Sequence, residues 1–248
     1  VLSQVPMEYY DELCANPDVT VTEASGAQIY YAEMNMTDPI LSDINVRKAI
    51  IKGMSRDNLS AYMDETLTPA YSLILSKCLN YSDDAVNYYK ENYDYDPDEA
   101  NRLLDEAGWK DSDGDGIREK DGTKLSFTFD DRDTESAKAI GQSLQIDMKA
   151  IGIDMQITTQ DWSYVNQDVN DGNFQMAYLG LGWSEPFLLL DMFCQRNAEA
   201  TNPDPDGQAE LVAEARKIVD FEDRTAAITE IQKKIMDYCT LLPFADST

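Results

Sequence analysis

Residues 125–157 constrain the fold more than any other stretch, because they read as a strand, a helix and a second strand in direct succession. The segments KLSFTF and IDMQITT each alternate apolar and polar residues, as half-buried strands do. Between them, apolar residues recur at helical spacing up to Gly152, which closes the helix. This order predicts a βαβ unit with parallel strands and a right-handed crossover. The apolar positions are Leu125, Phe127, Phe129, Ala137, Ile140, Leu144, Met148, Ile151, Ile153, Met155 and Ile157.

Helix and strand patterns also mix along the rest of the chain, which predicts an α/β domain. Residues 64–92 are expected to be irregular around the turn signal at 68–70. The remaining expected helices lie at 6–15, 43–54, 55–63, 97–107, 207–220 and 223–238, and the remaining extended stretches lie at 19–21, 29–35, 174–183 and 241–245. In the helix at 97–107, Asp96 is the expected N-cap, Pro97 the first residue and Glu99 the third, which forms a capping box.

Charge and composition exclude several classes of function. The chain has 47 acidic and 20 basic residues and a formal net charge of −27, so nucleic acid and anionic lipid would repel it. It contains no histidine, which excludes histidine-ligated zinc, the Ser-His-Asp triad and the Cys-His dyad. No run of 18 apolar residues is present, so no segment is expected to span a membrane.

The four cysteines are far apart and form no CxxC pair, which argues against a zinc knuckle. If the protein is exported, they allow three disulfide pairings that the sequence does not rank. Buried free thiols are the equal alternative. The positions are Cys14, Cys78, Cys194 and Cys239.

The segment DSDGDGIREKDG (111–122) begins like a calcium loop. An EF-hand needs a bidentate Glu at position 12 and a helix after the loop, but Gly122 and a predicted strand stand there, so we reject an EF-hand. A weaker Ca²⁺ site is one hypothesis, and a solvated Asp-Gly turn is the favoured alternative. The ligands of such a site would be Asp111, Asp113, Asp115 and the Ile117 carbonyl, completed by Glu119 or Asp121.

Six segments, taken in order, resemble the family 5 extracellular solute-binding proteins, the peptide-, oligopeptide- and nickel-binding receptors of ABC importers. The resemblance covers essentially the whole chain, and no single motif decides it. In that family the acidic Gly-rich stretch is an ordinary connection between a helix and a strand. The segments are NMTDPILSDINVRKAIIKGMSRDNL (35–59), TPA (68–70), YDPDEANRLLDEAGWKDSDGDGIREKDG (95–122), IGIDMQI (151–157), GW (182–183) and LLPF (241–244).

The resemblance implies one lobe of a two-lobed, class II periplasmic-binding-protein-like fold, with a mixed sheet flanked by helices. Residues 1–248 would form a single ligand-binding lobe, the second lobe of a longer receptor, without the preceding segments that include a lipoprotein signal. It implies a non-enzymatic, monomeric protein at the bacterial cell surface or in the periplasm. Its partners would be a peptide or another small solute and the permease subunits of the importer.

The resemblance also suggests ligand-binding residues. Trp183 matches the cleft tryptophan of the family, whose ring could stack on a ligand; a core tryptophan is the alternative. Glu185 lies near the acidic residue that peptide receptors pair with the ligand's α-ammonium, although it stands one position earlier; a surface glutamate is the alternative.

Two further candidates precede these in the chain. Asn35 matches a family position near the hinge, with backbone capping as its alternative role, and Tyr31 is a weaker candidate because either Tyr30 or Tyr31 must face the core. Residues 180–182 are Gly-Leu-Gly where some peptide binders carry an arginine, which puts carboxylate capture by this segment in doubt.

Three other functions compete with peptide binding. A nickel complex, a sugar or another small solute could be the ligand, although the missing histidine disfavours direct metal coordination by this lobe. A hydrolase with paired carboxylates is disfavoured, because no motif selects one pair from 47 acidic residues. A calcium-stabilised acidic structural domain is the third alternative.

Overall fold

The computed structural model describes residues 9–22, 28–62, 67–195 and 198–247. The helices are α1 (Tyr10–Ala15), α2 (Ile44–Gly53), α3 (Arg56–Ser60), α4 (Asp83–Tyr93), α5 (Pro97–Glu106), α6 (Glu135–Ala150), α7 (Trp162–Asp171), α8 (Pro186–Gln195), α9 (Ala198–Thr201), α10 (Pro205–Ala215) and α11 (Phe221–Asp237). The strands are β1 (Ile29–Met34), β2 (Leu67–Pro69), β3 (Glu119–Lys120), β4 (Thr123–Lys124), β5 (Ser126–Arg132), β6 (Asp154–Gln160), β7 (Met176–Leu181) and β8 (Leu241–Ser247).

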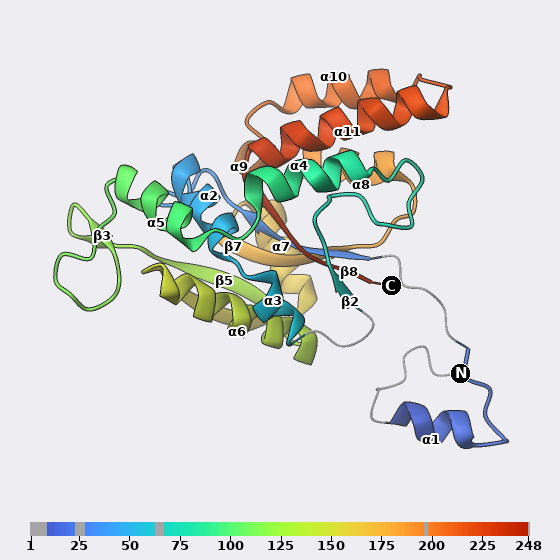
Figure 1. Cartoon of the computed structure of the whole chain (residues 1–248), viewed down its shortest axis with the longest axis horizontal. Helices are drawn as coiled ribbons and strands as arrows, with labels where there is room; N and C mark the ends of the chain where they lie inside the picture. Colours follow the sequence, from blue (N-terminus) through green and yellow to red (C-terminus); the bar gives the residue numbers. More distant parts are fainter. Residues whose placement is uncertain (1–8, 23–27, 63–66, 196–197, 248) are drawn as a thin grey trace.

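A mixed sheet with the strand order β2-β8-β1-β7-β5-β6 forms the centre of the fold. Strands β5, β6 and β7 are parallel, while β1 runs antiparallel to both β7 and β8, and β2 runs antiparallel to β8. The carboxyl ends of β5, β6, β7 and β8 therefore share one edge of the sheet with the amino ends of β1 and β2. We call this the carboxyl edge; β8 ends there beside the C-terminal label in Figure 1. The mixed sheet flanked by helices confirms the expected fold class.

The predicted βαβ unit is present as β5–α6–β6, with Phe127 paired to Met155 and Phe129 to Ile157 in parallel register. Thr134 caps α6 by accepting the N–H of Ala137. Successive residues on β5 face opposite sides of the sheet. Accordingly, the Asp131 carboxylate lies against Gly141 of α6, whereas the Asp130 carboxylate interacts electrostatically with Asp168 of α7. Helices α6 and α7 thus cover opposite faces.

Helix layers enclose the sheet, with α4, α8, α10 and α11 together on one side and α3 and α6 on the other (Figure 1). The core is continuous from the sheet into these layers. At its centre the Phe244 ring of β8 stacks on Tyr178 of β7, with ring centroids 5.9 Å apart, and meets the edge of Phe129 of β5. Three strands from distant parts of the sequence are therefore locked together by aromatic contacts.

Several expected helix boundaries are confirmed by their caps. The Asp96 carboxylate accepts the Glu99 N–H, and Pro97 is the first residue of α5. Asp43 caps α2 and Ser55 caps α3 through their side chains, as polar N-cap residues do.

The expectation that residues 64–92 are irregular is wrong, because this range holds β2 and most of α4. Helix α4 buries only Ala85, Tyr89 and Tyr93, one residue per turn. Its other positions are polar, so the apolar stripe is too narrow to stand out in the sequence. Helix α8 was also not predicted; it lies between the expected extended stretch at 174–183 and the expected helix at 207–220.

Helix α1 stands apart from the layered body and buries none of its residues (Figure 1). The expected helix at 6–15 is confirmed over Tyr10–Ala15; residues 6–8 lie outside the described part. No helix in the described ranges combines the length and apolarity needed to cross a bilayer. The four cysteines are free thiols, three of them buried, so the structure favours the free-thiol alternative over a disulfide.

Candidate functional site

Ligand contacts are expected at the carboxyl edge. Binding residues commonly lie on loops at the carboxyl ends of strands, because the sheet holds these loops rigidly. Tyr30 is the second residue of β1, whose amino end lies at this edge. Arg132 is the last residue of β5, and Trp183 follows the end of β7 by two residues. Trp162, at the start of α7, follows the end of β6. We treat these residues, together with Gly180 and Glu185, as the candidate site.

Trp183 is exposed at the carboxyl edge, with 38% of its surface accessible, so it is not the core tryptophan that was its alternative. Its backbone carbonyl accepts a hydrogen bond from the thiol of Cys78 at 3.2 Å. Cys78 is buried, and burial raises the pKa of its thiol to about 11, so at neutral pH the sulfur carries the proton that it donates. The Trp183 segment thereby rests on the loop that contains Cys78.

Glu185 is also exposed at this edge, but its carboxylate already has a structural partner. The Oε2 atom accepts the backbone N–H of Leu188 at 3.0 Å, which caps the amino end of α8. The other carboxylate oxygen, Oε1, accepts no hydrogen bond from any described residue, so capping and ligand contact are compatible roles.

Asn35 and Tyr31 do not join the candidate site. Asn35 follows the carboxyl end of the antiparallel strand β1, where Met34 pairs with Met176 at the start of β7. It therefore lies at the opposite edge from Trp183, a separation of about 20 Å at roughly 3.4 Å per residue.

The side chains of both residues have partners within the chain. The Asn35 amide is buried and donates to the carbonyls of Gly172 and Phe174, while its oxygen accepts from Thr37. This is the backbone-capping role that was its alternative. Tyr31 is 1% exposed and packs edge-on against Phe193, so Tyr31 is the tyrosine of the pair that faces the core.

Arg132 is the residue of the candidate site that the sequence analysis missed. Its half-buried guanidinium lies over the ring of Trp162, 4.6 Å from the centroid, and its Nε atom is buried without a hydrogen-bond partner. No ion pair or side-chain hydrogen bond joins it to any described residue. Every other arginine in the described ranges donates at least one hydrogen bond; these are Arg47, Arg56, Arg102, Arg118, Arg216 and Arg224.

Gly180 and the ring of Tyr30 lie beside Arg132. A methyl group added at Gly180 would lie 3.1 Å from two carbons of the Tyr30 ring and 3.8 Å from Nη1 of Arg132. The Tyr30 ring also stacks on Tyr178, with centroids 5.9 Å apart. Although residues 180–182 lack an arginine, the neighbouring strand thus places one beside Gly180. A charged residue that ends a buried strand of a βαβ unit is the sequence signal that could have identified Arg132.

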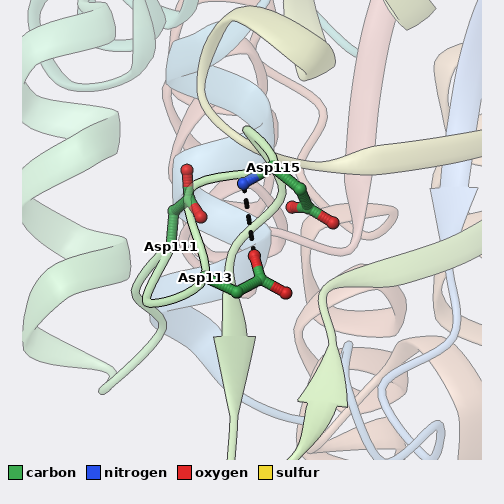
Figure 2. A group of neighbouring side chains, drawn as sticks. All are labelled: Asp111, Asp113 and Asp115. Carbon is green, nitrogen blue, oxygen red and sulfur yellow. Dashed lines mark hydrogen bonds between the residues drawn. The ribbon is translucent and has the colours of Figure 1, made fainter.

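The acidic loop lies elsewhere, next to the β3–β4 hairpin, and Figure 2 shows its three aspartates. The carboxylate oxygens of Asp111, Asp113 and Asp115 come within 4.8 Å of one another. Asp111 accepts two backbone N–H groups, from Gly114 and Gly116, and Asp115 accepts the N–H of Ile117. These bonds are those of an Asp-Gly turn.

A cation from the chain itself already faces this loop. The Lys124 ammonium lies 2.8 Å from Asp113, 3.0 Å from Asp115 and 3.4 Å from Glu119. Hydrogen bonds to these aspartates raise the pKa of Lys124, and the same contact lowers the pKa of Asp113. The geometry therefore favours the turn over the Ca²⁺ hypothesis, which stays a prediction to be tested.

Comparisons with known proteins show that the chain is similar to bacterial extracellular solute-binding proteins. The model of the family "Bacterial extracellular solute-binding proteins, family 5 Middle" matches residues 1–200. The oligopeptide-binding protein AppA of Bacillus subtilis is 30% identical over 166 residues, which is 66% of this chain and 30% of that protein.

Solved structures agree in fold. The structure of AppA from Bacillus subtilis in complex with a nonapeptide superposes with a TM-score of 0.81 and 23% identity, covering 98% of this chain and 49% of the other. NikA from Brucella suis in complex with Fe(III)-EDTA superposes with a TM-score of 0.77 and 26% identity, covering 91% of this chain and 46% of the other. The chain thus spans about half of each of these structures or less.

Proposed function

Because the chain belongs to the bacterial extracellular solute-binding proteins of family 5, we propose that it is one lobe of a peptide receptor that serves an ABC importer. Family 5 consists of solute-binding receptors found outside the cell or in the periplasm. The lobe would capture its ligand without chemical change, by closing against a second lobe. In the whole receptor we expect a lipid anchor or a periplasmic location, a monomer, and docking to the permease subunits.

One observation carries the choice of a peptide over an uncharged solute. Arg132 is a half-buried cation whose side chain has no hydrogen-bond acceptor among the described residues, in a chain that carries 47 acidic residues. A guanidinium binds a planar carboxylate with two parallel hydrogen bonds, and this is the end group that every unblocked peptide supplies. Trp183 would form an apolar wall for the ligand, and the remaining oxygen of Glu185 would face its ammonium end.

A metal complex with a polycarboxylate chelator is the second candidate, because Arg132 would recognise its carboxylates equally well. The chain has no histidine, and the thiol of Cys78 at this edge is buried and held protonated. The metal would therefore have to arrive with its own ligands. The solved structure of NikA with Fe(III)-EDTA is an example of such a ligand in this family.

Native mass spectrometry of the 248-residue chain tests the proposal. The chain would be mixed with a pool of tri- to hexapeptides at millimolar concentration, and separately with the same pool in C-terminally amidated form. We expect adducts from the free-acid pool that weaken in Arg132→Gln and Trp183→Ala. The matched control is Arg102→Gln, which removes an exposed arginine from α5.

The two pools distinguish the candidates. Equal adducts from both pools would contradict a role for Arg132 in carboxylate capture. The absence of adducts with either pool, together with binding of a metal–EDTA complex, would replace the peptide by the chelate.

A further inference from the structure

The contact between Arg132 and Trp162 joins two elements that end at the same edge. In the parallel pairing of β5 and β6, Arg132 is opposite Gln160, and Trp162 follows Gln160 by two residues. Trp162 is the first residue of α7, and its half-buried ring lies beneath the guanidinium, 4.6 Å from the centroid to Cζ. This is within the range at which a cation is attracted to an aromatic face.

The position of Trp162 is fixed by the start of its helix. The Asp161 carboxylate caps α7 by accepting the backbone N–H of Ser163 at 2.9 Å and its hydroxyl at 2.6 Å. Val165, one turn later, is fully buried and attaches α7 to the sheet. The ring is therefore presented to Arg132 by a capped and anchored helix.

Two carboxylates lie near enough to Arg132 to interact with its charge, and both accept hydrogen bonds from groups other than its guanidinium. Asp131 and Asp161 both interact electrostatically with the guanidinium, but neither forms an ion pair with it. The Asp131 side chain points to the opposite face of β5, against Gly141, and its Oδ1 accepts the backbone N–H of Arg132. The Asp161 Oδ1 is occupied by Ser163. The aromatic face is thus the contact that remains to orient the guanidinium.

We propose that Trp162 is a positioning residue for the ligand carboxylate: it holds the Arg132 guanidinium by its face, so that the N–H edge stays open toward the ligand. This inference rests on the proposed function. An aromatic face accepts no strong hydrogen bond, so it restricts the arginine rotamers without competing for the N–H groups. A carboxylate partner at the same place would neutralise the cation and exclude an anionic ligand end.

The test measures the contact between Trp162 and Arg132 separately from the binding of a carboxylate. Three variants would be compared with the natural chain: Trp162→Phe, which keeps a ring, Trp162→Leu, which removes it, and the matched control Tyr164→Leu. Tyr164 lies on the same helix and is 66% exposed. The first readout needs no ligand: it is the proton chemical shift of the Arg132 Nε–H, assigned by its loss in Arg132→Lys.

The second readout is the affinity for acetate, measured by titrating sodium acetate against sodium chloride at equal ionic strength. We expect an upfield ring-current shift of the Nε–H signal that persists in Trp162→Phe and disappears in Trp162→Leu. Acetate affinity should fall roughly two- to thirtyfold in Trp162→Leu, less in Trp162→Phe, and not in Tyr164→Leu.

The possible failures differ. If Trp162→Leu binds acetate as the natural chain does, the positioning role is overturned while the proposed function stands. If the natural chain shows the ring-current shift but no response to acetate, the carboxylate site itself is overturned, and the positioning role with it. If Trp162→Leu does not fold, Trp162→Phe decides: an acetate affinity between those of Tyr164→Leu and Arg132→Lys supports the inference, and an affinity equal to either of them overturns it.

Discussion

The thiol of Cys78 donates a hydrogen bond to the backbone carbonyl of Trp183, 105 residues further along the chain, at 3.2 Å. The Cys78 loop is itself attached to the sheet, because the Ser76 N–H donates to the Asp246 carboxylate of β8. Within the described ranges, residues 182–184 form no other hydrogen bond. The exposed tryptophan is thus held from below by a single buried donor.

We predict that Cys78→Ala loosens the Trp183 segment and that Cys78→Ser, which keeps a donor, does not. A thiol is a weak donor, so the free energy of unfolding should change by less than about 1.5 kcal/mol. Acrylamide quenching of tryptophan fluorescence, with Trp183→Phe as the baseline for the other two tryptophans, should rise in Cys78→Ala. Identical quenching in all Cys78 variants would show that the bond does not restrain Trp183.

The pH dependence of stability should reveal the two buried aspartates that precede Arg132. Burial raises the pKa of Asp130 and that of Asp131 to about 6, above the usual value of 3.8. The folded state therefore binds protons that the unfolded state has already released, so this contribution to stability is complete below about pH 4 and is lost as the pH rises through 6.

Asp131→Asn isolates that contribution. At pH 7 we expect it to raise the free energy of unfolding by about 1–2 kcal/mol, and the gain should vanish near pH 4. Chemical denaturation across this range measures it, with Asp18→Asn, an exposed aspartate, as the control. A loss of stability at pH 7 would mean that the carboxylate has a compensating partner.

Calcium should have little effect on the natural chain, because the Lys124 ammonium already faces Asp113 and Asp115. We expect millimolar CaCl₂ to leave the melting temperature unchanged. In Lys124→Met the facing carboxylates would repel one another, so the melting temperature should fall in EDTA and recover in part with Ca²⁺. Calorimetry decides the matter, and a clear stabilisation of the natural chain by Ca²⁺ would restore the metal hypothesis.

Gly180→Ala should destabilise the fold by about 1–2 kcal/mol, because the added methyl group would lie 3.1 Å from the Tyr30 ring. The cost should shrink when Tyr30 is replaced by Leu, since the two changes share one contact. Denaturant titrations of the single and double variants measure this coupling. Strictly additive effects would locate the cost elsewhere.

The sequence predicted the central βαβ unit and the caps of α2, α3 and α5, because these depend on short-range periodicity and capping residues. It did not predict α4, whose buried stripe is one residue wide, nor the pairing of β1 between β7 and β8, which joins residues more than 140 positions apart. Long-range antiparallel pairing has no local signature.

The candidate site was predicted only in part. Trp183 and Glu185 were proposed from the resemblance to the family, and the structure places both just after β7, which ends at Leu181. Asn35 was proposed because it matches a family position near the hinge, and the antiparallel direction of β1, which the sequence does not show, places it at the far edge. Arg132 was missed because its role depends on Trp162 and Gly180, which only the folded sheet brings beside it.

The guanidinium of Arg132 is expected to lower the stability of the ligand-free fold while it raises the affinity for an anionic ligand. A half-buried cation whose Nε–H has no acceptor among the described residues weakens the ligand-free fold, and an anion that binds there would remove this penalty. Selection for thermal stability alone would replace this arginine with an apolar side chain and give a more stable domain that lacks the proposed carboxylate contact. Any effort to evolve a more heat-tolerant version of this domain should therefore keep Arg132 unchanged, because a screen that rewards melting temperature would select against it early.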